Sequence, residues 1–329
     1  MTECAADALA RPPAPPPEDV GERWEAAMRA GDFAAAWRAS DASLAARDPA
    51  TRDDPRLPYH LRWVWDGRPF DECHVLVRCY HGLGDTLQFA RFLPELRRRA
   101  RRVTLECQPA LAALLAAMAD AVVPFRPDAP MPPAECDIEI MELAHALRIS
   151  QATLAAPFPY LTASARRTFP HPAIGLCWQA GDWDSRRSVP LPLLAAALDA
   201  PGRRFVSLQR GAGAVAAGRP GAAKLFHADE CPETVETSDS VGATAALIGG
   251  LDLVVTVDTM VAHLAGALGA RVALLLQAEA DWRWMTDRGE TPWYPGMRLY
   301  RQARAGDWAA PLAGLAEDLR AGRLGVPIC

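Results

Sequence analysis

The sequence predicts an α/β protein with two lobes, each built around a parallel sheet. Short apolar runs typical of buried strands alternate with stretches of helical periodicity from residue 73 onward, as in parallel sheets. A proline-broken stretch at residues 156–172 interrupts the alternation, which then restarts. We therefore predict one lobe at residues 59–160 and a second at residues 161–329, with a ligand cleft between the carboxyl ends of their strands.

A short N-terminal region precedes the lobes. Residues 1–20 contain Arg11-Pro12-Pro13-Ala14-Pro15-Pro16-Pro17 and are expected to form a disordered, proline-rich leader. Residues 21–58 have the apolar spacing of two helices around Ala30-Gly31-Asp32 and look like one degenerate tetratricopeptide hairpin. One such hairpin cannot bury its own apolar face, so we expect it to pack on the domain that follows.

The first lobe opens with a buried-strand run at residues 73–79, and a helix is predicted at residues 86–99. The remaining elements follow in the same alternating order. They are a strand at residues 103–107, a helix at 109–118 and two short strands at 121–125 and 137–140.

The second lobe repeats the alternation. Predicted strands lie at residues 174–178, 204–208, 251–257 and 272–276, with a weaker one at 224–227, and predicted helices lie at 191–198, 243–249 and 259–268. A last helix is expected to end near residue 320. The strand at 251–257 has the apolar character of a parallel strand that is buried on both faces.

Composition argues against several classes of partner. The formal net charge is −5 and no basic stripe dominates, so a nucleic-acid partner is not expected. The eight cysteines are scattered without a Cys-x-x-Cys pair, which argues against zinc and for a reducing cytoplasm. No signal peptide and no apolar run of membrane-spanning length stands out, so we expect a cytoplasmic protein and leave peripheral membrane contact open.

The strand-to-helix junction Val257-Asp258-Thr259 is the first candidate site. Asp258 is a good N-cap, and the helix behind it offers backbone N–H groups and partial positive charge that suit a diphosphate. Thr259 adds a hydroxyl, and His263 lies four residues on, on the same helix face. The alternative is that Asp258 only caps the helix and His263 only packs.

The second candidate site is the loop after the first strand. Gly82 and Gly84 allow the backbone to turn tightly and to approach a ligand. Asp85 follows at the start of the next helix, where its carboxylate could accept the proton of an attacking hydroxyl. His81 is a second candidate for that role, and a structural turn with a helix cap is the alternative.

The loop after the strand at 174–178 supplies further candidates. Arg186 and Arg187 can neutralise a departing diphosphate, and Trp178 at the strand end is grouped with them as a donor contact. The alternative is that both arginines are solvated surface residues. Gln209 ends the next strand and could meet the base or ribose of a nucleotide. The pair Asp182-x-Asp184 resembles a metal-binding pair, but this pattern is common in flexible loops and we predict no metal site.

Together these segments resemble the glycosyltransferase domain attached to bacterial tetratricopeptide-repeat proteins. That group is similar to the ADP-heptose:lipopolysaccharide heptosyltransferases and, more distantly, to O-linked N-acetylglucosamine transferases. The resemblance covers roughly residues 60–320 and rests on residues 82–89, Trp178 with 186–191, 207–209, 257–269 and 281–284. The chain departs from the group at Tyr80-His81, where members often have Glu-Gln, and in having almost no tetratricopeptide array.

The resemblance implies a GT-B fold, in which two Rossmann-like lobes enclose a cleft. It also implies metal-independent, inverting transfer of a sugar from a nucleotide-diphosphate-sugar to a hydroxyl of a glycan, lipopolysaccharide or protein, without a cofactor. Carried over by motif, Asp85 would be the acceptor base, Arg186 or Arg187 the basic residue at the diphosphate, and Asp258, Thr259 and His263 the donor contacts.

Two other functions fit the same fold. A non-catalytic descendant would bind a nucleotide-sugar or act as a scaffold in a surface-polysaccharide or motility system. A nucleotide-sugar epimerase would need additional acid/base carboxylates in the cleft, which the sequence does not single out.

Overall fold

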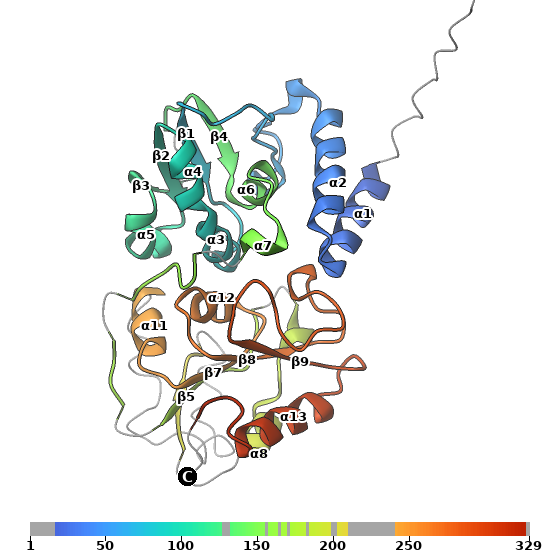
Figure 1. The fold of residues 1–329 in the computed structure, drawn as a ribbon, viewed down its shortest axis with the longest axis vertical. Helices are drawn as coiled ribbons and strands as arrows, with labels where there is room; N and C mark the ends of the chain where they lie inside the picture. The colour runs from blue at the N-terminus through green and yellow to red at the C-terminus, as the bar shows by residue number, and fades with distance from the viewer. Residues whose placement is uncertain are drawn as a thin grey trace, which may run out of the picture.

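The computed structural model describes residues 17–126, 132–154, 157–163, 166–169, 172–181, 184–198, 203–209 and 241–326. Within these residues, two parallel sheets form two lobes that lie one above the other in Figure 1. The predicted leader up to residue 16 and the weak strand predicted at 224–227 lie outside the described residues.

The first lobe contains a four-stranded sheet in the order β3-β2-β1-β4, with all neighbours parallel. Its strands are β1 (His74–Arg78), β2 (Arg102–Cys107), β3 (Ala121–Pro124) and β4 (Cys136–Glu139). Its main helices are α3 (Leu83–Phe89), α4 (Leu93–Arg99) and α5 (Pro109–Leu115), followed by the short helices α6 (Leu143–Ala146) and α7 (Gln151–Leu154), which we had not predicted.

The helix predicted at residues 86–99 is divided in the structure. Helices α3 and α4 are separated by a 3-10 turn at Ala90–Phe92. Pro94, near the start of α4, explains the break, because proline has no N–H to donate to the carbonyl four residues earlier. Helix α3 also begins at Leu83, so Asp85 lies in its first turn.

The second lobe contains a five-stranded parallel sheet in the order β6-β5-β7-β8-β9. Its strands are β5 (Ala173–Cys177), β6 (Arg204–Ser207), β7 (Leu253–Val257), β8 (Val272–Leu276) and β9 (Met297–Arg301). Its described helices include α8 (Leu191–Leu198), α11 (Val241–Ile248), α12 (Met260–Ala267) and α13 (Ala309–Arg320). Strand β9, which pairs with β8, is an element that we had not predicted.

The predicted hairpin consists of α1 (Pro17–Ala30) and α2 (Phe33–Ala46). Helix α1 begins inside the segment predicted as a disordered leader, since proline is tolerated in the first helical turn. The Asp32 carboxylate caps α2 by accepting the N–H of Ala35 at 2.9 Å.

The hairpin packs against both lobes and not only against the domain that follows it. Trp37 donates its indole N–H to the carbonyl of Ile149 in the first lobe at 2.6 Å. The ring of Phe33 lies 6.0 Å from that of Trp293 in the second lobe, in an edge-on arrangement. Figure 1 accordingly shows α1 and α2 beside the first lobe, with their lower ends at the second.

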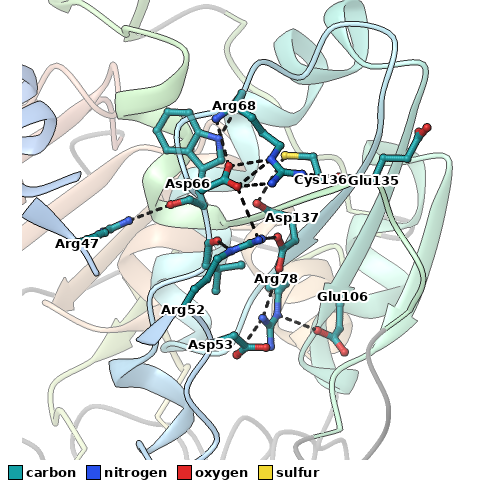
Figure 2. A network of polar contacts seen from close by, with 12 residues as sticks. Arg47, Arg52, Asp53, Asp66, Arg68, Arg78, Glu106, Glu135, Cys136 and Asp137 are labelled. Atoms are coloured by element: carbon teal, nitrogen blue, oxygen red, sulfur yellow. Dashed lines mark hydrogen bonds and ion pairs between the residues drawn. The ribbon is translucent and has the colours of Figure 1, made fainter. Parts of the chain in front are cut away.

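A buried charge network fixes the carboxyl end of β1. Figure 2 shows the Arg78 guanidinium surrounded by the carboxylates of Asp53, Glu106 and Asp137, at distances of 3.3, 3.8 and 3.7 Å. Burial raises the pKa of Glu106 and of Asp137. Because a buried charge is costly without partners, this network holds the strand end that leads into residues 80–85.

One apolar core runs from the hairpin through the first lobe to the α12 side of the second sheet, and a separate core lies between that sheet, α8 and α13. Helices α3 and α12 are in direct contact, so the lobes share packed surface at their junction. No helix in the described part of the chain is both long enough and apolar enough to cross a membrane.

Candidate active site

A cleft of about 880 Å³ lies between the two lobes, where the strands of both sheets end. From the first lobe it is lined by residues 80–85, and from the second by Gln209, Asp258, Thr259, His263, Arg187 and Arg283 among others. The structure therefore brings both predicted junctions to one cavity, as expected at the carboxyl ends of parallel strands.

The first-lobe wall of the cleft is the start of α3. Gly82 is the N-cap, and the Oδ2 atom of Asp85 accepts the Gly82 N–H at 2.9 Å. Gly84 has a role that we did not foresee. A Cβ atom at this position would lie 2.8 Å from Cδ2 of His263, so glycine allows α3 to approach α12 closely. The close approach, and not a tight turn, is what requires this glycine.

Arg283 contacts Asp85 from the opposite lobe. Its Nη2 atom lies 2.6 Å from Oδ1 of Asp85, its Nη1 atom 2.9 Å from Oδ1 of Asp281, and its Nε donates to Gln88 at 2.7 Å. Burial works against the charge of Arg283, but the two neighbouring carboxylates outweigh burial and raise its pKa. Sequence analysis included this segment only among those that carry the family resemblance and gave Arg283 no role.

His81 lines the cleft beside Asp85. Its Nε2 atom lies 3.8 Å from Oε1 of Glu139, which ends strand β4. Glu139 is buried, and burial raises its pKa well above the ordinary value. The first-lobe wall thus holds two groups that can exchange protons, Asp85 and His81.

The second-lobe wall is the start of α12, and here one prediction was wrong. The N-cap is Thr259 and not Asp258. The carboxylate of Asp258 is buried beside the helix, 4.0 Å from Nε2 of His263. Burial raises the pKa of Asp258, and its backbone carbonyl accepts a hydrogen bond from Arg187 at 3.0 Å.

His263 lies behind the junction as a neutral ring. Its Nδ1 atom is 2.8 Å from the hydroxyl of Tyr294, and its ring stacks on Trp284 with centroids 5.4 Å apart. Burial, followed by the charges of nearby arginines, lowers the pKa of His263 well below its ordinary value. A neutral imidazole can donate or accept a hydrogen bond but adds no charge to the cleft.

The two loop arginines have different environments. Arg187 lines the cleft. Arg186 has a side chain that is 68% exposed and pairs with Asp184 at 2.8 Å. This pairing lowers the pKa of Asp184 to about 2, and Asp184 also accepts a hydrogen bond from Gln277 at 2.9 Å.

Asp182, one member of the loop pair that resembles a metal-binding pattern, lies outside the described residues. Across the residues that the structure does describe, no group of three or more His, Cys, Asp and Glu side chains is arranged to hold a metal ion.

Trp178 and Gln209 were both predicted donor contacts, but the structure places only Gln209 in the cleft. The Trp178 side chain packs in the core with Ile174 and Leu176, two strand residues of the same parity, and does not line the cleft. Gln209 lines the cleft, but its Oε1 atom accepts the backbone N–H groups of Trp178 and Gln179 at 3.0 and 2.8 Å. Its side chain therefore ties the ends of β5 and β6 together.

Comparison with known proteins identifies the fold. No family model matches the chain. The E. coli ADP-heptose lipopolysaccharide heptosyltransferase II has a TM-score of 0.55 at 15% identity over 75% of this chain and 98% of that one. A family 9 glycosyl transferase from Veillonella parvula has a TM-score of 0.50 at 11% identity over 80% and 91%. The chain thus has the GT-B architecture, with two parallel-sheet lobes around a cleft.

One curated relative shares sequence with the chain. Protein FlbA from Caulobacter vibrioides is 28% identical over 161 residues, which make up 46% of this chain. The match covers only 25% of the length of FlbA.

Proposed function

We propose that the protein is a glycosyltransferase that moves a sugar from a nucleotide-diphosphate-sugar to a hydroxyl of a glycan, lipopolysaccharide or protein. The observation that supports this proposal is the composition of the cleft between the two lobes. The first lobe contributes a carboxylate, Asp85, and the second contributes a helix N-terminus with Arg187 beside it. A proton acceptor thereby faces an anion site across one cavity.

The second lobe is the proposed donor half. The start of α12 carries partial positive charge, and the Thr259 hydroxyl donates back to the Val257 carbonyl at 3.4 Å instead of capping the helix. Arg187 is held beside this helix end by its bond to the Asp258 carbonyl. These groups fit a diphosphate, with Gln209 and the ends of β5 and β6 next to the nucleoside and His263 as a neutral neighbour.

The proposed reaction is a single displacement. The acceptor oxygen attacks the anomeric carbon while Asp85 takes its proton. The bond from that carbon to the diphosphate oxygen breaks, and the nucleoside diphosphate leaves with the electron pair. Arg187 and the α12 N-terminus stabilise the charge that develops on the leaving group, so no step needs a metal ion. Attack opposite the leaving group inverts the anomeric configuration.

Asp85 retains the capacity to accept this proton. Its two oxygens already accept the Gly82 N–H and the Arg283 guanidinium. A carboxylate has about four lone-pair sites, so a hydroxyl can still bind. His81 is the competing base, and a comparison of Asp85→Asn with His81→Asn decides between them. We expect Asp85→Asn to lower the transfer rate by about 10²- to 10⁴-fold and His81→Asn to lower it less.

The test is a screen of UDP-, ADP- and GDP-sugars by thermal shift, followed by transfer and hydrolysis assays with the donors that bind. ADP-heptose belongs in the screen because the E. coli structural neighbour is named for it. Stabilisation by at least one donor and release of its nucleotide support the proposal. Full activity of Asp85→Asn would refute the assignment of the base, and the absence of any donor binding would refute the donor site.

One observation favours a second function, a non-catalytic nucleotide-sugar-binding protein. Both oxygens of Asp85 already accept hydrogen bonds from other groups of the protein. Under this alternative, a donor would stabilise the protein but neither hydrolysis nor transfer would follow. The same screen therefore separates the two functions.

A further inference from the structure

The segment that carries Arg283 is held at both ends by one residue of the N-terminal hairpin. The Nη1 atom of Arg29 donates to the carbonyl of Ala280 at 2.6 Å, and the Arg29 carbonyl accepts the N–H of Thr286 at 3.1 Å. Arg29 lies in the last turn of α1, which contacts the 3-10 turn at Trp282–Trp284. The hairpin thus brackets residues 280–286.

Further contacts fix the middle of this segment against the hairpin. The rings of Trp24 and Trp282 meet edge to face with centroids 5.0 Å apart. Met285 has a φ of 52°, a left-handed conformation that a non-glycine residue adopts only when its surroundings enforce it. A Cβ atom at Gly31 would lie 3.4 Å from Sδ of Met285, so the turn between α1 and α2 closes over this residue.

The middle of residues 280–286 reaches the cleft. Arg283, at its centre, reaches Asp85 with one nitrogen, Asp281 with the second and Gln88 with the third. The Asp85 carboxylate is therefore held on one side by its own helix and on the other by Arg283. Its orientation depends on where the hairpin places residues 280–286.

We propose that Arg29 and Arg283 are positioning residues for acceptor activation, through which the N-terminal hairpin sets the orientation of Asp85. This inference rests on the proposed function of Asp85 as the acceptor base. The described contacts of Arg29 with the second lobe are to Ala280 and Thr286 and not to Arg187 or Thr259 at the proposed diphosphate site. Its loss is therefore expected to change the geometry at Asp85 and to leave the binding of the nucleotide-sugar intact. The hairpin then contributes to catalysis by orienting Asp85 through residues 280–286, as well as stabilising the fold.

The main test is steady-state kinetics of Arg29→Met in the full chain. We expect kcat to fall about 10- to 100-fold, because small misplacements of a reacting group cost this much. The donor KM and the thermal shift with the donor stay within about twofold of wild type on the same argument. Arg29→Lys keeps a donor for the Ala280 carbonyl and is expected to recover part of the rate. A normal kcat, or a loss of donor binding that matches the loss of rate, would overturn the inference.

Two matched variants in the hairpin control for indirect effects. Glu25→Gln removes the ion pair of Arg29 with Glu25 but leaves the bond to Ala280 in place. Arg38→Met removes an exposed arginine of α2. Both are expected to retain kcat within about twofold, since neither change reaches residues 280–286. Equal losses in Arg29→Met and Arg38→Met would show that any damage to the hairpin has the same effect, which contradicts a specific role.

Hydrogen exchange separates this inference from the proposed function. Amides of residues 280–286 are expected to exchange faster in Arg29→Met than in Arg38→Met, whether or not the protein transfers sugar. If wild-type protein transfers no sugar but exchange at 280–286 responds to Arg29, the proposed function fails while the structural link stands. If exchange at 280–286 is the same in both variants, the link fails even in an active enzyme.

Discussion

The two strand-to-helix junctions that face each other across the cleft differ in the side-chain hydrogen bonds at the start of their helices. In the first lobe, the Asp85 carboxylate accepts the N–H of the N-cap residue Gly82, so the helix end is neutralised by its own side chain. In the second lobe, the Thr259 hydroxyl donates to the Val257 carbonyl and makes no side-chain cap bond within the described residues. The same supersecondary unit therefore yields one helix whose first turn carries a carboxylate and one whose first turn carries none.

The charges around the two junctions follow the same division. Asp85 carries a carboxylate into the cleft, where it repels a diphosphate and can accept a proton. Near the start of α12, burial lowers the pKa of His263 and raises that of Asp258, so it disfavours the charged form of both groups, and Arg187 adds positive charge. The base is therefore assigned to the junction whose first helical turn carries a carboxylate. The anion site is assigned to the junction whose first turn carries none. The four predictions below test that division.

The largest expected effect concerns Arg187 and its sequence neighbour. Arg187→Met removes a cation that lines the cleft, and we expect kcat to fall about 10²- to 10³-fold because one stabiliser of the leaving group is lost. Arg186→Met removes an exposed cation that is already paired with Asp184, and a change below about twofold is expected. Steady-state transfer kinetics of both variants measure this contrast. Similar losses in the two variants would contradict the donor assignment of the second-lobe junction.

The close approach of the two junctions can be tested at Gly84. Gly84→Ala places a Cβ atom 2.8 Å from the His263 ring, and overpacking of this kind costs about 1–3 kcal/mol of stability. Helix propensity favours alanine by up to about 1 kcal/mol and offsets part of that cost. Gly289→Ala is the control, because a Cβ atom there meets nothing within 4 Å and its expected change is within about 0.5 kcal/mol. Urea unfolding of both variants checks the difference, and a Gly84→Ala protein as stable as the control would show that α3 and α12 are less tightly packed.

The neutral state of His263 predicts a pH dependence of stability. Its folded pKa lies well below 6.5, so below about pH 6.5 the unfolded chain binds a proton that the folded chain does not. The stability that His263 contributes is therefore present above pH 6.5 and is lost as the pH falls, by at most about 1.4 kcal/mol per pH unit. His263→Asn should flatten the dependence of unfolding free energy on pH between about 5 and 7.

Other groups also titrate in this range, so the variant slopes are compared directly. His145 has a lowered pKa and acts in the same direction, while Glu139 has a raised one and acts in the opposite direction. His145→Asn should flatten the same curve independently of His263→Asn. An unchanged slope in His263→Asn would indicate that the ring is charged in the folded protein.

Much of the structure of the two junctions could be predicted from the sequence, because the strands and the residues that follow them form local patterns. Apolar runs placed most strands within a residue or two, since parallel strands are buried on both faces. Asp85 and Thr259 each follow such a run. Because parallel strands end on the same side of their sheet, each residue was predicted at the carboxyl ends of its own sheet, on its side of the cleft. Strand β9, by contrast, has arginines at Arg298 and Arg301 among its apolar residues, which weakened the signal.

The missed and misplaced residues show where local patterns fail. Arg283 pairs with Asp85 over 198 residues of chain, a distance that no spacing encodes. The available signals were the charged residue between Trp282 and Trp284 and the place of residues 281–284 in the family resemblance. Trp178 was misplaced although strand alternation with Ile174 and Leu176 could have assigned it to the core. The cap of α12 was misassigned by one residue because Asp258 and Thr259 are both good N-caps.

The smallest expected effect comes from placing a carboxylate at the N-cap of α12, so that both helices carry a negative charge at their start. Thr259→Asp supplies α12 with a carboxylate cap, which should raise the unfolding free energy by up to about 1 kcal/mol. The same negative charge would compete with a diphosphate at the helix end, so donor affinity is expected to fall a few-fold, equivalent to about 1 kcal/mol. Thr259→Asn caps the helix without charge and should leave donor affinity closer to wild type. Because Asp and Asn stabilise helix ends to a similar degree, unfolding by urea should not distinguish the two variants, while calorimetry with the donor should. Equal donor affinities in the two variants would mean that the diphosphate does not lie at the start of α12, and the two junctions would then no longer differ in function as they do in structure.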